Sequence, residues 1–338
     1  MVAVRADPLK IYPKYLFAVL RSDSVQSQID NMHVGTMIPH FKKGDFDKLY
    51  IPLLDSKSQI AVGDLYFELS ERITLLRETN TTLEAIAQAL FKSWLVDFDP
   101  VRAKMEGRAP EGMDEATAAL FPDGFEESEL GLVPRGWSLL PLSKAFDINP
   151  ARKLKRGDVA PYLDMAGVGI QSHVVQGVIQ REMGSGTKFL NGDTLLARIT
   201  PCLENGKTCF VDFLSGDKVG WGSTEFVVLR PKAPLPPYFG YLLCRHTAFR
   251  DHAVQSMSGT SGRQRVQNDV LGMYPVAVPS ASVAAAFDGV VTTAQRKISE
   301  NHNQAQTLAS LRDTLLPRLI SGQLRVPDAE ALAEDAEA

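Results

Sequence analysis

The chain has 338 residues, of which 44% are hydrophobic, and carries a formal net charge of −4. That length allows about two ordinary hydrophobic cores. Its longest apolar runs fall short of 18 residues, and the N-terminal residues lack the apolar core of a signal peptide, so the sequence argues against a membrane-spanning or secreted protein and indicates the cytoplasm.

The charges are segregated along the chain. Residues 131–280 contain 17 lysines and arginines against 11 acidic residues, whereas residues 97–130 contain 3 against 10. A positive globular region beside negative connectors suits a module that binds a polyanion, because neutralising phosphates supplies most nonspecific affinity for nucleic acid. A net charge of +6 is modest, and a solvated surface is the alternative interpretation.

Residues 1–55 predict a short helix around residues 15–20, a loop rich in Gly, His and Lys, and a strand at 48–53 (KLYIPL). Pro39 and Pro52 keep these elements short. Residues 56–96 follow with apolar side chains at steps of three, four and seven, which is the period of one helix face. We therefore expect one long coiled-coil helix there, with a seam formed by Leu65, Leu69, Ile73, Leu76, Leu83, Ile86, Leu90 and Trp94.

Residues 97–130 are rich in Pro, Gly and acidic side chains, and we interpret them as a linker with one helical turn near 115–120. Residues 131–280 then predict short strands bounded by Gly, Asn and Asp, two helices within 234–256, and a last strand at 273–279. The expected fold class is α+β, with a mixed curved sheet in this region.

A second long helix is expected at residues 281–323, followed by an acidic, disordered tail at 324–338. Its seam matches the first helix in period and length, so antiparallel pairing is favoured over two helices in separate bundles. The seam residues are Val283, Phe287, Val290, Ala294, Ile298, Ala305, Leu308, Leu315 and Leu319.

The two halves also form an internal repeat. TTLEAIAQAL (81–90) aligns with QTLASLRDTL (306–315) at an offset of 225, and PKYLFAVLR (13–21) aligns with PYFGYLLCR (237–245) at 224. At the latter offset five identities occur, among them Arg21 with Arg245 and Tyr50 with Tyr274. Each repeat is thus a globular region followed by a long helix, and residues 1–55 correspond only to the C-terminal third of residues 131–280.

Searches for enzyme motifs give no candidate catalytic or metal site. ENGKT (204–208) resembles the end of a phosphate loop, but Pro201 stands where the motif needs glycine. His246 and His252 lie six residues apart, whereas a metal pair on a helix needs three or four. Cys202, Cys209 and Cys244 have no metal-ligand spacing and are interpreted as buried small hydrophobes.

Three loops are candidate DNA contacts: loop A (151–157), loop B (198–208) and loop C (256–265). Loop A concentrates cations, loop B mixes cations with Glu and Asn, and loop C joins cations to Gly and Ser, which allow close approach to phosphate. For loop A, a solvated basic turn is the alternative. The candidate DNA-binding residues are Arg152, Lys153, Lys155, Arg156, Arg198, Glu204, Asn205, Lys207, Ser258, Ser261, Arg263, Gln264 and Arg265. The position of loop C in the first repeat holds His33, His40, Lys42 and Lys43, which suggests one task performed on two different sequences.

The chain resembles the specificity subunits of type I restriction–modification enzymes. The residues that carry the resemblance are VDFDPVRAKMEGRAPEGMDEATAALFPDGFEESELGLVPRGW (96–137), NGDTLLARITPCLENGKTCFVDF (191–213), GSTEFVVLRP (222–231) and LRDTLLPRLISGQ (311–323). The resemblance implies two target recognition domains, each followed by a conserved long helix, with the helices paired as a spacer. It also implies no catalysis and no cofactor in this chain. Modification subunits would methylate adenine with S-adenosylmethionine, and restriction subunits would translocate and cut DNA with ATP and magnesium.

The chain departs from that pattern at its start, where only the C-terminal third of a first recognition domain is expected. Residues 131–280 would then be the one complete recognition domain. Self-association of two chains, which would select an inverted repeat in DNA, and a gene fragment without a working assembly both remain open. Two other functions are weighed as alternatives: a stand-alone DNA methyltransferase and a coiled-coil adaptor without DNA contact.

Overall fold

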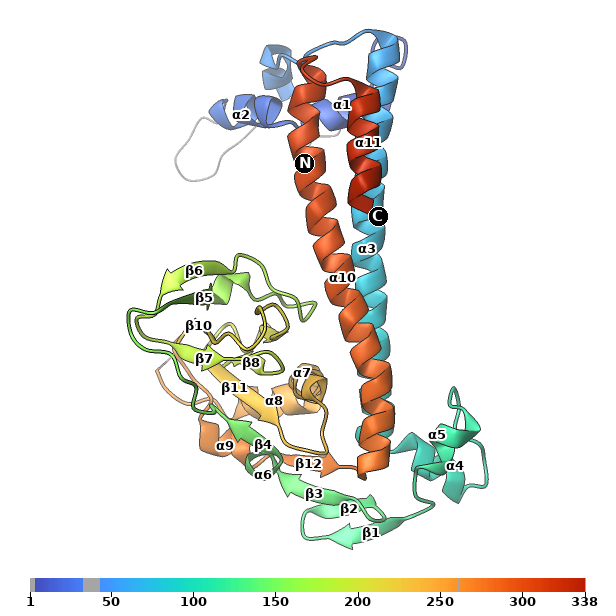
Figure 1. Ribbon diagram of the computed structural model, residues 1–338, viewed down its shortest axis with the longest axis vertical. Coiled ribbons are helices and arrows are strands. Elements are labelled where there is room, and N and C mark those ends of the chain that lie inside the picture. Colours follow the sequence, from blue (N-terminus) through green and yellow to red (C-terminus); the bar gives the residue numbers. More distant parts are fainter. Residues whose placement is uncertain (1–3, 33–42, 261, 338) are drawn as a thin grey trace. The chain divides into compact units, whose positions relative to one another are not determined.

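The computed structural model describes residues 4–32, 43–260 and 262–337. The described chain forms two compact units (Figure 1). Unit 1 comprises Met1–Thr79 and Glu300–Ala338, and unit 2 comprises Asn80–Ser299. Each unit has hydrophobic core residues of its own. The part of the expected first-repeat loop at 33–42 lies outside the described residues.

Two helices of equal length, 40 residues each, contribute to both units: α3 (Ser56–Leu95) and α10 (Ala281–Ile320). They run side by side (Figure 1) and antiparallel. In unit 1 the Arg312 guanidinium donates to Ser70 Oγ at 3.4 Å, and in unit 2 Asn80 Nδ2 donates to the Ile298 carbonyl at 3.0 Å. The predicted helices and their antiparallel pairing are therefore confirmed.

The predicted seam is correct in unit 1 and partly wrong in unit 2. Leu69 and Leu76 are buried as expected, but Ile86 and Val290 are about half exposed. Ala87 and Val291, one position further along each helix, are buried in their place. A straight helix repeats every 3.6 residues, so a face drifts away from a strict heptad pattern over several turns.

The internal repeat is visible in the element bounds. The short helices α1 (Pro13–Leu20) and α2 (Asp23–Asn31) correspond, at an offset of 224, to α7 (Pro237–Arg245) and α8 (Thr247–Gln255). Both α1 and α7 begin with proline, whose fixed φ suits the first helical position. The 3₁₀ helix η1 (Lys43–Lys48) likewise corresponds to the short helix α9 (Asn268–Gly272).

The prediction of a strand at 48–53 is wrong. Among the described residues, this segment is the end of η1 followed by coil. Its repeat counterpart is strand β12 (Pro275–Val278), which pairs with β3 (Ser138–Pro141). Among the described residues before Phe125, no strand is present to pair with residues 48–53. Instead, the side-chain amide of Gln28 accepts from the Tyr50 backbone N–H at 3.0 Å and donates to the Tyr50 carbonyl at 2.9 Å.

The prediction of a disordered tail is wrong as well, because residues Val326–Glu337 form helix α11. Ala329 is fully buried and Ala333 is 8% exposed, both in the core of unit 1. Small side chains allow this helix to approach the core closely. Of the acidic residues that indicated disorder, Asp328 and Glu330 stand on either side of Ala329 in the sequence.

Residues 97–130 are folded instead of forming an open linker. They contain helix α4 (Asp99–Met105), helix α5 (Glu115–Ala119), which confirms the predicted turn, and strand β1 (Phe125–Ser128), paired with β2 (Gly131–Pro134). Aromatic side chains hold the segment in the core of unit 2: Trp94, Phe98, Phe121, Phe125 and Trp137 contact one another edge-on or tilted.

The rest of unit 2 confirms the α+β class but divides the expected single sheet in two. One sheet is mixed and has the order β6-β5-β10-β7, with β5 and β10 parallel; the other is antiparallel and has the order β4-β11-β8-β9. The strands are β4 (Phe146–Ile148), β5 (Val159–Leu163), β6 (Ile179–Glu182), β7 (Thr187–Phe189), β8 (Thr194–Ala197), β9 (Thr208–Phe210), β10 (Gly220–Gly222) and β11 (Phe226–Pro231). Short helical turns α6 (Leu142–Ala145) and η2 (Met165–Gly167) complete it.

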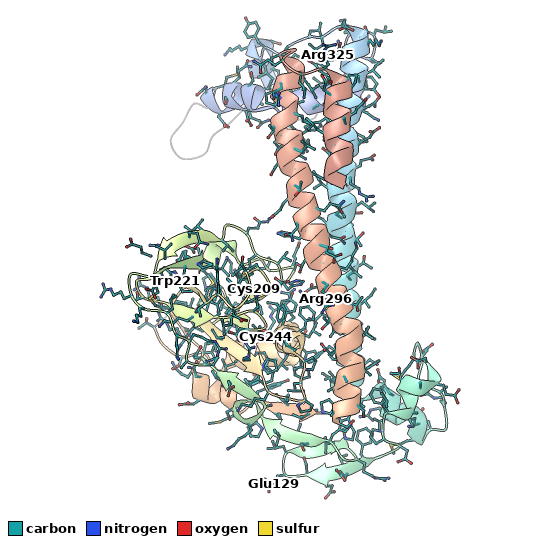
Figure 2. All side chains as sticks on the ribbon, in the orientation of Figure 1. Glu129, Cys209, Trp221, Cys244, Arg296 and Arg325 are labelled. Atoms are coloured by element: carbon teal, nitrogen blue, oxygen red, sulfur yellow. The ribbon has the colours of Figure 1, made fainter. Side chains whose placement is uncertain are left out.

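The antiparallel sheet is the structural centre of unit 2. All four residues of β8 are buried, and α7 packs against β8, β9 and β11. Cys209 on β9 and Cys244 on α7, both marked in Figure 2, are fully buried, and burial raises the pKa of both thiols. They act as small apolar residues in this core.

Candidate nucleic-acid interface

Loops B and C, which are separated by residues 209–255 in the sequence, are joined in the structure. The Thr200 N–H donates to the Gln264 carbonyl at 3.0 Å, and the Val266 N–H donates to the Arg198 carbonyl at 3.0 Å. Loop C also closes on itself through two backbone hydrogen bonds between Ser258 and Arg265, at 2.9 and 3.0 Å. Two of the three predicted contact loops therefore form one surface.

Glu225, in the turn before β11, lies at this junction. The Arg265 guanidinium donates to both Glu225 carboxylate oxygens at 2.6 to 3.0 Å. These hydrogen bonds, and to a smaller extent the charges of Arg265 and Arg198, hold the pKa of Glu225 below its ordinary value although burial opposes this. Glu225 is absent from the sequence-based candidates, because its separation of 40 residues from Arg265 gives no local signal.

Two arginines on the α7–α8 segment hold loop B in place. Arg245 donates to the carbonyls of Ile170 and Gly206, at 2.6 and 3.2 Å, and Arg250 donates to the Glu204 carbonyl at 3.1 Å. Gly206 has a φ of +75°. A Cβ there would lie 3.1 Å from the Arg250 guanidinium, so glycine suits both the backbone and the close approach.

The predicted residues of loops B and C divide into exposed and engaged side chains. Glu204, Asn205, Ser258 and Arg263 are exposed. Lys207 donates from Nζ to the Met165 carbonyl at 2.7 Å, while Arg198 and Gln264 are half-buried. Ser261 lies outside the described residues.

Loop A is anchored elsewhere, beside the mixed sheet. Lys188 Nζ donates to the Leu154 carbonyl at 2.7 Å, and the Gly157 N–H donates to the Met183 carbonyl at 2.8 Å. Lys153, Lys155 and Arg156 are exposed, as a contact loop requires.

Arg152 corrects the prediction for loop A. Its side chain is 14% exposed and bonds the fully buried Asp193 at 3.0 Å, a carboxylate that it shares with Arg230. A buried carboxylate needs cationic partners because leaving it unpaired costs several kcal/mol. The structure therefore places Arg152 in a supporting ion pair and not among the exposed cations.

Strand β6 adds a cation that sequence reasoning missed. All four β6 residues are exposed, and the strand is at the edge of its sheet. The Arg181 guanidinium lies over the Tyr162 ring at 4.7 Å and near the Trp221 ring at 5.8 Å. Stacking on aromatic rings fixes a cation in place. In the sequence, the signal for this site would have been an arginine that alternates with aromatic residues.

A buried polar network ties the sheets of unit 2 to its helices. His173 Nε2 lies 3.3 Å from the Asp212 carboxylate and 3.1 Å from Ser299 Oγ, and Nδ1 lies 3.0 Å from the Tyr238 hydroxyl and 3.7 Å from Glu84. Burial alone would lower the pKa of His173, but the hydrogen bonds and charges of the two carboxylates raise it. The same contacts hold the pKa of Asp212 low despite its burial.

Within the residues described, no cluster of three or more His, Cys, Asp or Glu is arranged to hold a metal ion. Helices long and apolar enough to cross a membrane are likewise missing from that part of the chain.

Known proteins similar to this chain share one description. The type I restriction enzyme HindI specificity subunit of Haemophilus influenzae is 25% identical over 361 aligned positions, which cover 93% of this chain and 78% of that protein. The MjaIX specificity subunit of Methanocaldococcus jannaschii is 22% identical and covers 97% of this chain and 76% of its own. No family model matches the chain.

The fold agrees with these relatives. The crystal structure of a type I restriction–modification S subunit from M. genitalium matches with a TM-score of 0.52 at 18% identity, covering 93% of this chain and 74% of that one. The class defined by the fold is thus a paired long-helix scaffold that carries an α+β globular region. Over more than nine-tenths of its length the chain is similar to type I restriction enzyme specificity subunits.

Proposed function

We propose that this chain recognises a DNA sequence as the specificity subunit of a type I restriction–modification complex. The observation that carries the proposal is the match to specificity subunits over at least nine-tenths of the chain. The fold of the chain also matches that of a solved S subunit. The chain itself performs no catalysis in this role. It directs adenine methylation and DNA cleavage by partner subunits.

The proposed division of labour follows the charges and the loops. Residues 131–280 form the complete target recognition domain, and residues 1–55 correspond to the C-terminal third of such a domain, as the repeat indicates. Loops B and C, which form one surface, read base edges with Arg198, Asn205 and Arg263. Loop A and Arg181 of β6 contact phosphates and position the duplex.

The proposed partners are double-stranded DNA, a methyltransferase subunit and a translocase–nuclease subunit. S-adenosylmethionine, ATP and magnesium act in those partners, and this chain needs no cofactor of its own. Because the proposed ligand is DNA, the proposed location is the cytoplasm. The paired helices, α3 and α10, supply the spacer on which the methyltransferase subunit assembles.

Selection from a randomised duplex library tests the proposal. The full-length chain, alone and with its methyltransferase subunit, is incubated with random 30-base-pair duplexes, and the bound DNA is sequenced. Enrichment of one defined motif is expected, together with methylation of that motif only when the chain is present. Bound DNA without any enriched motif, or S-adenosylmethionine bound by the chain alone, would contradict the role.

A further inference from the structure

One carboxylate lies between two arginines at the junction of loops B and C. Arg265 bonds Glu225 through its Nε and Nη2 atoms, and Glu225 is 22% exposed at the side chain against 39% for Arg265. Arg198 is close enough for its charge to act on Glu225. Among the described residues, no group accepts a hydrogen bond from the Arg198 guanidinium, whose Nε is buried.

The backbone around this ion pair is fixed from several sides. The Arg198 N–H donates to the Glu225 carbonyl at 2.9 Å, the Glu225 N–H donates to Ser223 Oγ at 3.1 Å, and Ile199 and Arg265 form an isolated β-bridge. An exposed ion pair on mobile loops contributes little. Here both partners are attached to backbones that hydrogen bonds hold in one arrangement, so the guanidinium has a defined direction.

The geometry of arginine decides which atoms remain for a ligand. Guanidinium carries five N–H donors in a plane. Glu225 occupies the edge formed by Nε and Nη2, and the Arg263 carbonyl accepts from Nη1 at 3.3 Å. The terminal edge, with one N–H of Nη1 and one of Nη2, is not the edge that the carboxylate occupies. That edge matches two acceptors side by side, as guanine presents with O6 and N7 in the major groove.

We propose that Glu225 is a positioning residue that presents the terminal edge of Arg265 to a guanine of the target sequence. The inference rests on the proposed DNA-recognition function and assigns one base position within it. Glu225 does not contact DNA in this arrangement. Its carboxylate holds the guanidinium plane and limits the attraction of the two arginines for phosphate, so that the pair favours a base edge.

The test compares Glu225→Gln, Arg265→Ala and Arg265→Lys with the unaltered full-length chain in the duplex-library selection. Lysine keeps the charge but not the planar pair of donors. For both Arg265 variants, preference for one G·C pair should fall roughly 5- to 150-fold, the range for one bidentate contact. Glu225→Gln should relax the same position, and adding it to Arg265→Ala should relax that position no further.

Asp217→Asn is the matched control, because it removes an equal charge from an exposed residue of unit 2. Asp217→Asn should leave base preference unchanged. Glu225→Gln and Asp217→Asn, which each lose one negative charge, should both bind random duplex somewhat more tightly. The inference is wrong if Glu225→Gln keeps full preference, or if it favours a new base instead of relaxing the choice. Thermal unfolding of each variant identifies a loss caused by misfolding, and Arg265→Lys then decides the question. If the unaltered chain selects no motif, the proposed function itself fails.

Discussion

The arginines of unit 2 perform two different tasks that their sequence positions do not distinguish. Arg152, Arg245 and Arg250 are engaged with carbonyls or with a buried carboxylate and hold the loops in place. Arg263 is exposed on loop C. In the proposed function, arginines of the first kind would affect DNA binding only by keeping the loops in place, whereas Arg263 would be available to a base.

Replacing Arg263 and Lys153 by alanine separates base reading from phosphate contact. Arg263→Ala should cost about 1–3 kcal/mol of discrimination at one base position. Lys153→Ala should weaken binding to all duplexes alike and reduce the slope of affinity against salt by about one. Affinities for the selected duplex and a scrambled duplex, measured over a range of salt, check both. Equal behaviour of the two variants would contradict the assignment of loops A and C.

His173 shows how a single buried residue can escape sequence analysis. The sequence drew attention to His246 and His252, whereas His173 lies in a segment that looked like a short strand. In the structure it is fully buried between carboxylates from two separate segments. Only tertiary contacts make this histidine different from any other, so the sequence carries no local signal for it.

The network should give unit 2 a pH-dependent stability. Because the folded-state pKa of His173 is raised, its contribution is fully present below the ordinary value of about 6.5 and is lost as pH rises through the folded pKa. The folded-state pKa of Asp212 is lowered, so its contribution is present above about pH 4 and is lost as pH falls through its folded pKa.

Thermal unfolding between pH 5 and 9 measures this for the unaltered chain, His173→Gln and Asp212→Asn. His173→Gln should cost about 3–5 kcal/mol near pH 6, because two carboxylates lose their buried cation. The cost should shrink at higher pH. In Asp212→Asn, stability should begin to fall at a lower pH as the pH is raised. Asp212 no longer raises the pKa of His173 there, so burial lowers that pKa. A pH-independent cost in His173→Gln would show that the histidine is neutral.

At the scale of elements, close packing of α1 on α3 depends on one glycine. A Cβ at Gly63 would lie 2.6 Å from the Tyr15 backbone nitrogen and 3.0 Å from the Lys14 carbonyl carbon. Both are backbone atoms, which cannot move aside as a flexible side chain can. The helix therefore accepts a residue of low helix propensity inside its first turns in exchange for this contact.

Gly63→Ala should destabilise the protein by about 1–3 kcal/mol, the range for overpacking. Gly289→Ala provides the matched control within α10, because that glycine is exposed and a Cβ there would meet no atom within 4 Å. The control should gain up to about 1 kcal/mol from better helix propensity. Chemical denaturation followed by circular dichroism compares them. If both variants gain stability, α1 does not pack on α3 as described.

Sequence patterns predicted elements well where a pattern is local and long. The period of the long helices and the repeat offset located α3 and α10, and proline marked the starts of α1 and α7. The patterns failed where the outcome depends on a partner. Residues 48–53 have strand character, yet without a neighbouring strand the backbone of Tyr50 bonds a glutamine side chain instead.

The candidate site follows the same division. Loops B and C became candidates because cations lie beside Asn and Gly in loop B and beside Ser and Gly in loop C. Their joining, and the place of Glu225 between Arg198 and Arg265, depend on sheet registers that no single stretch of sequence specifies. The engaged state of Arg152 depends in the same way on the burial of Asp193, 41 residues away.

At the scale of the whole molecule, the two units have separate cores and different spectroscopic reporters. The chain has three tryptophans, Trp94, Trp137 and Trp221, and all of them belong to unit 2. Circular dichroism, by contrast, reports the helices of both units. A substitution confined to the core of unit 1 can therefore be followed by two probes with different sensitivity.

Leu76→Asp is the substitution for this purpose, because Leu76 is 7% exposed in the core of unit 1. Burying an unpaired carboxylate there should cost at least about 3 kcal/mol. The helical transition should shift to a lower temperature, with a smaller shift in tryptophan fluorescence. Leu75→Asp, at a neighbouring position that is 54% exposed, should change neither. Unaltered stability in Leu76→Asp would contradict the antiparallel pairing in unit 1.

The buried Asn80 has a consequence for a chain that contains the same helix twice. Two duplicated helices with matching apolar faces can in principle pair with each other or each with its own copy in a second molecule. Asn80 is 8% exposed and bonds the Ile298 carbonyl, while the equivalent position in α10 is Ala305, which is also buried. A buried amide at only one of the two equivalent positions makes the pairings unequal, since such a group is tolerated where an acceptor meets it. Asn80 thereby helps the duplicated sequence to distinguish its two halves when the helices pair.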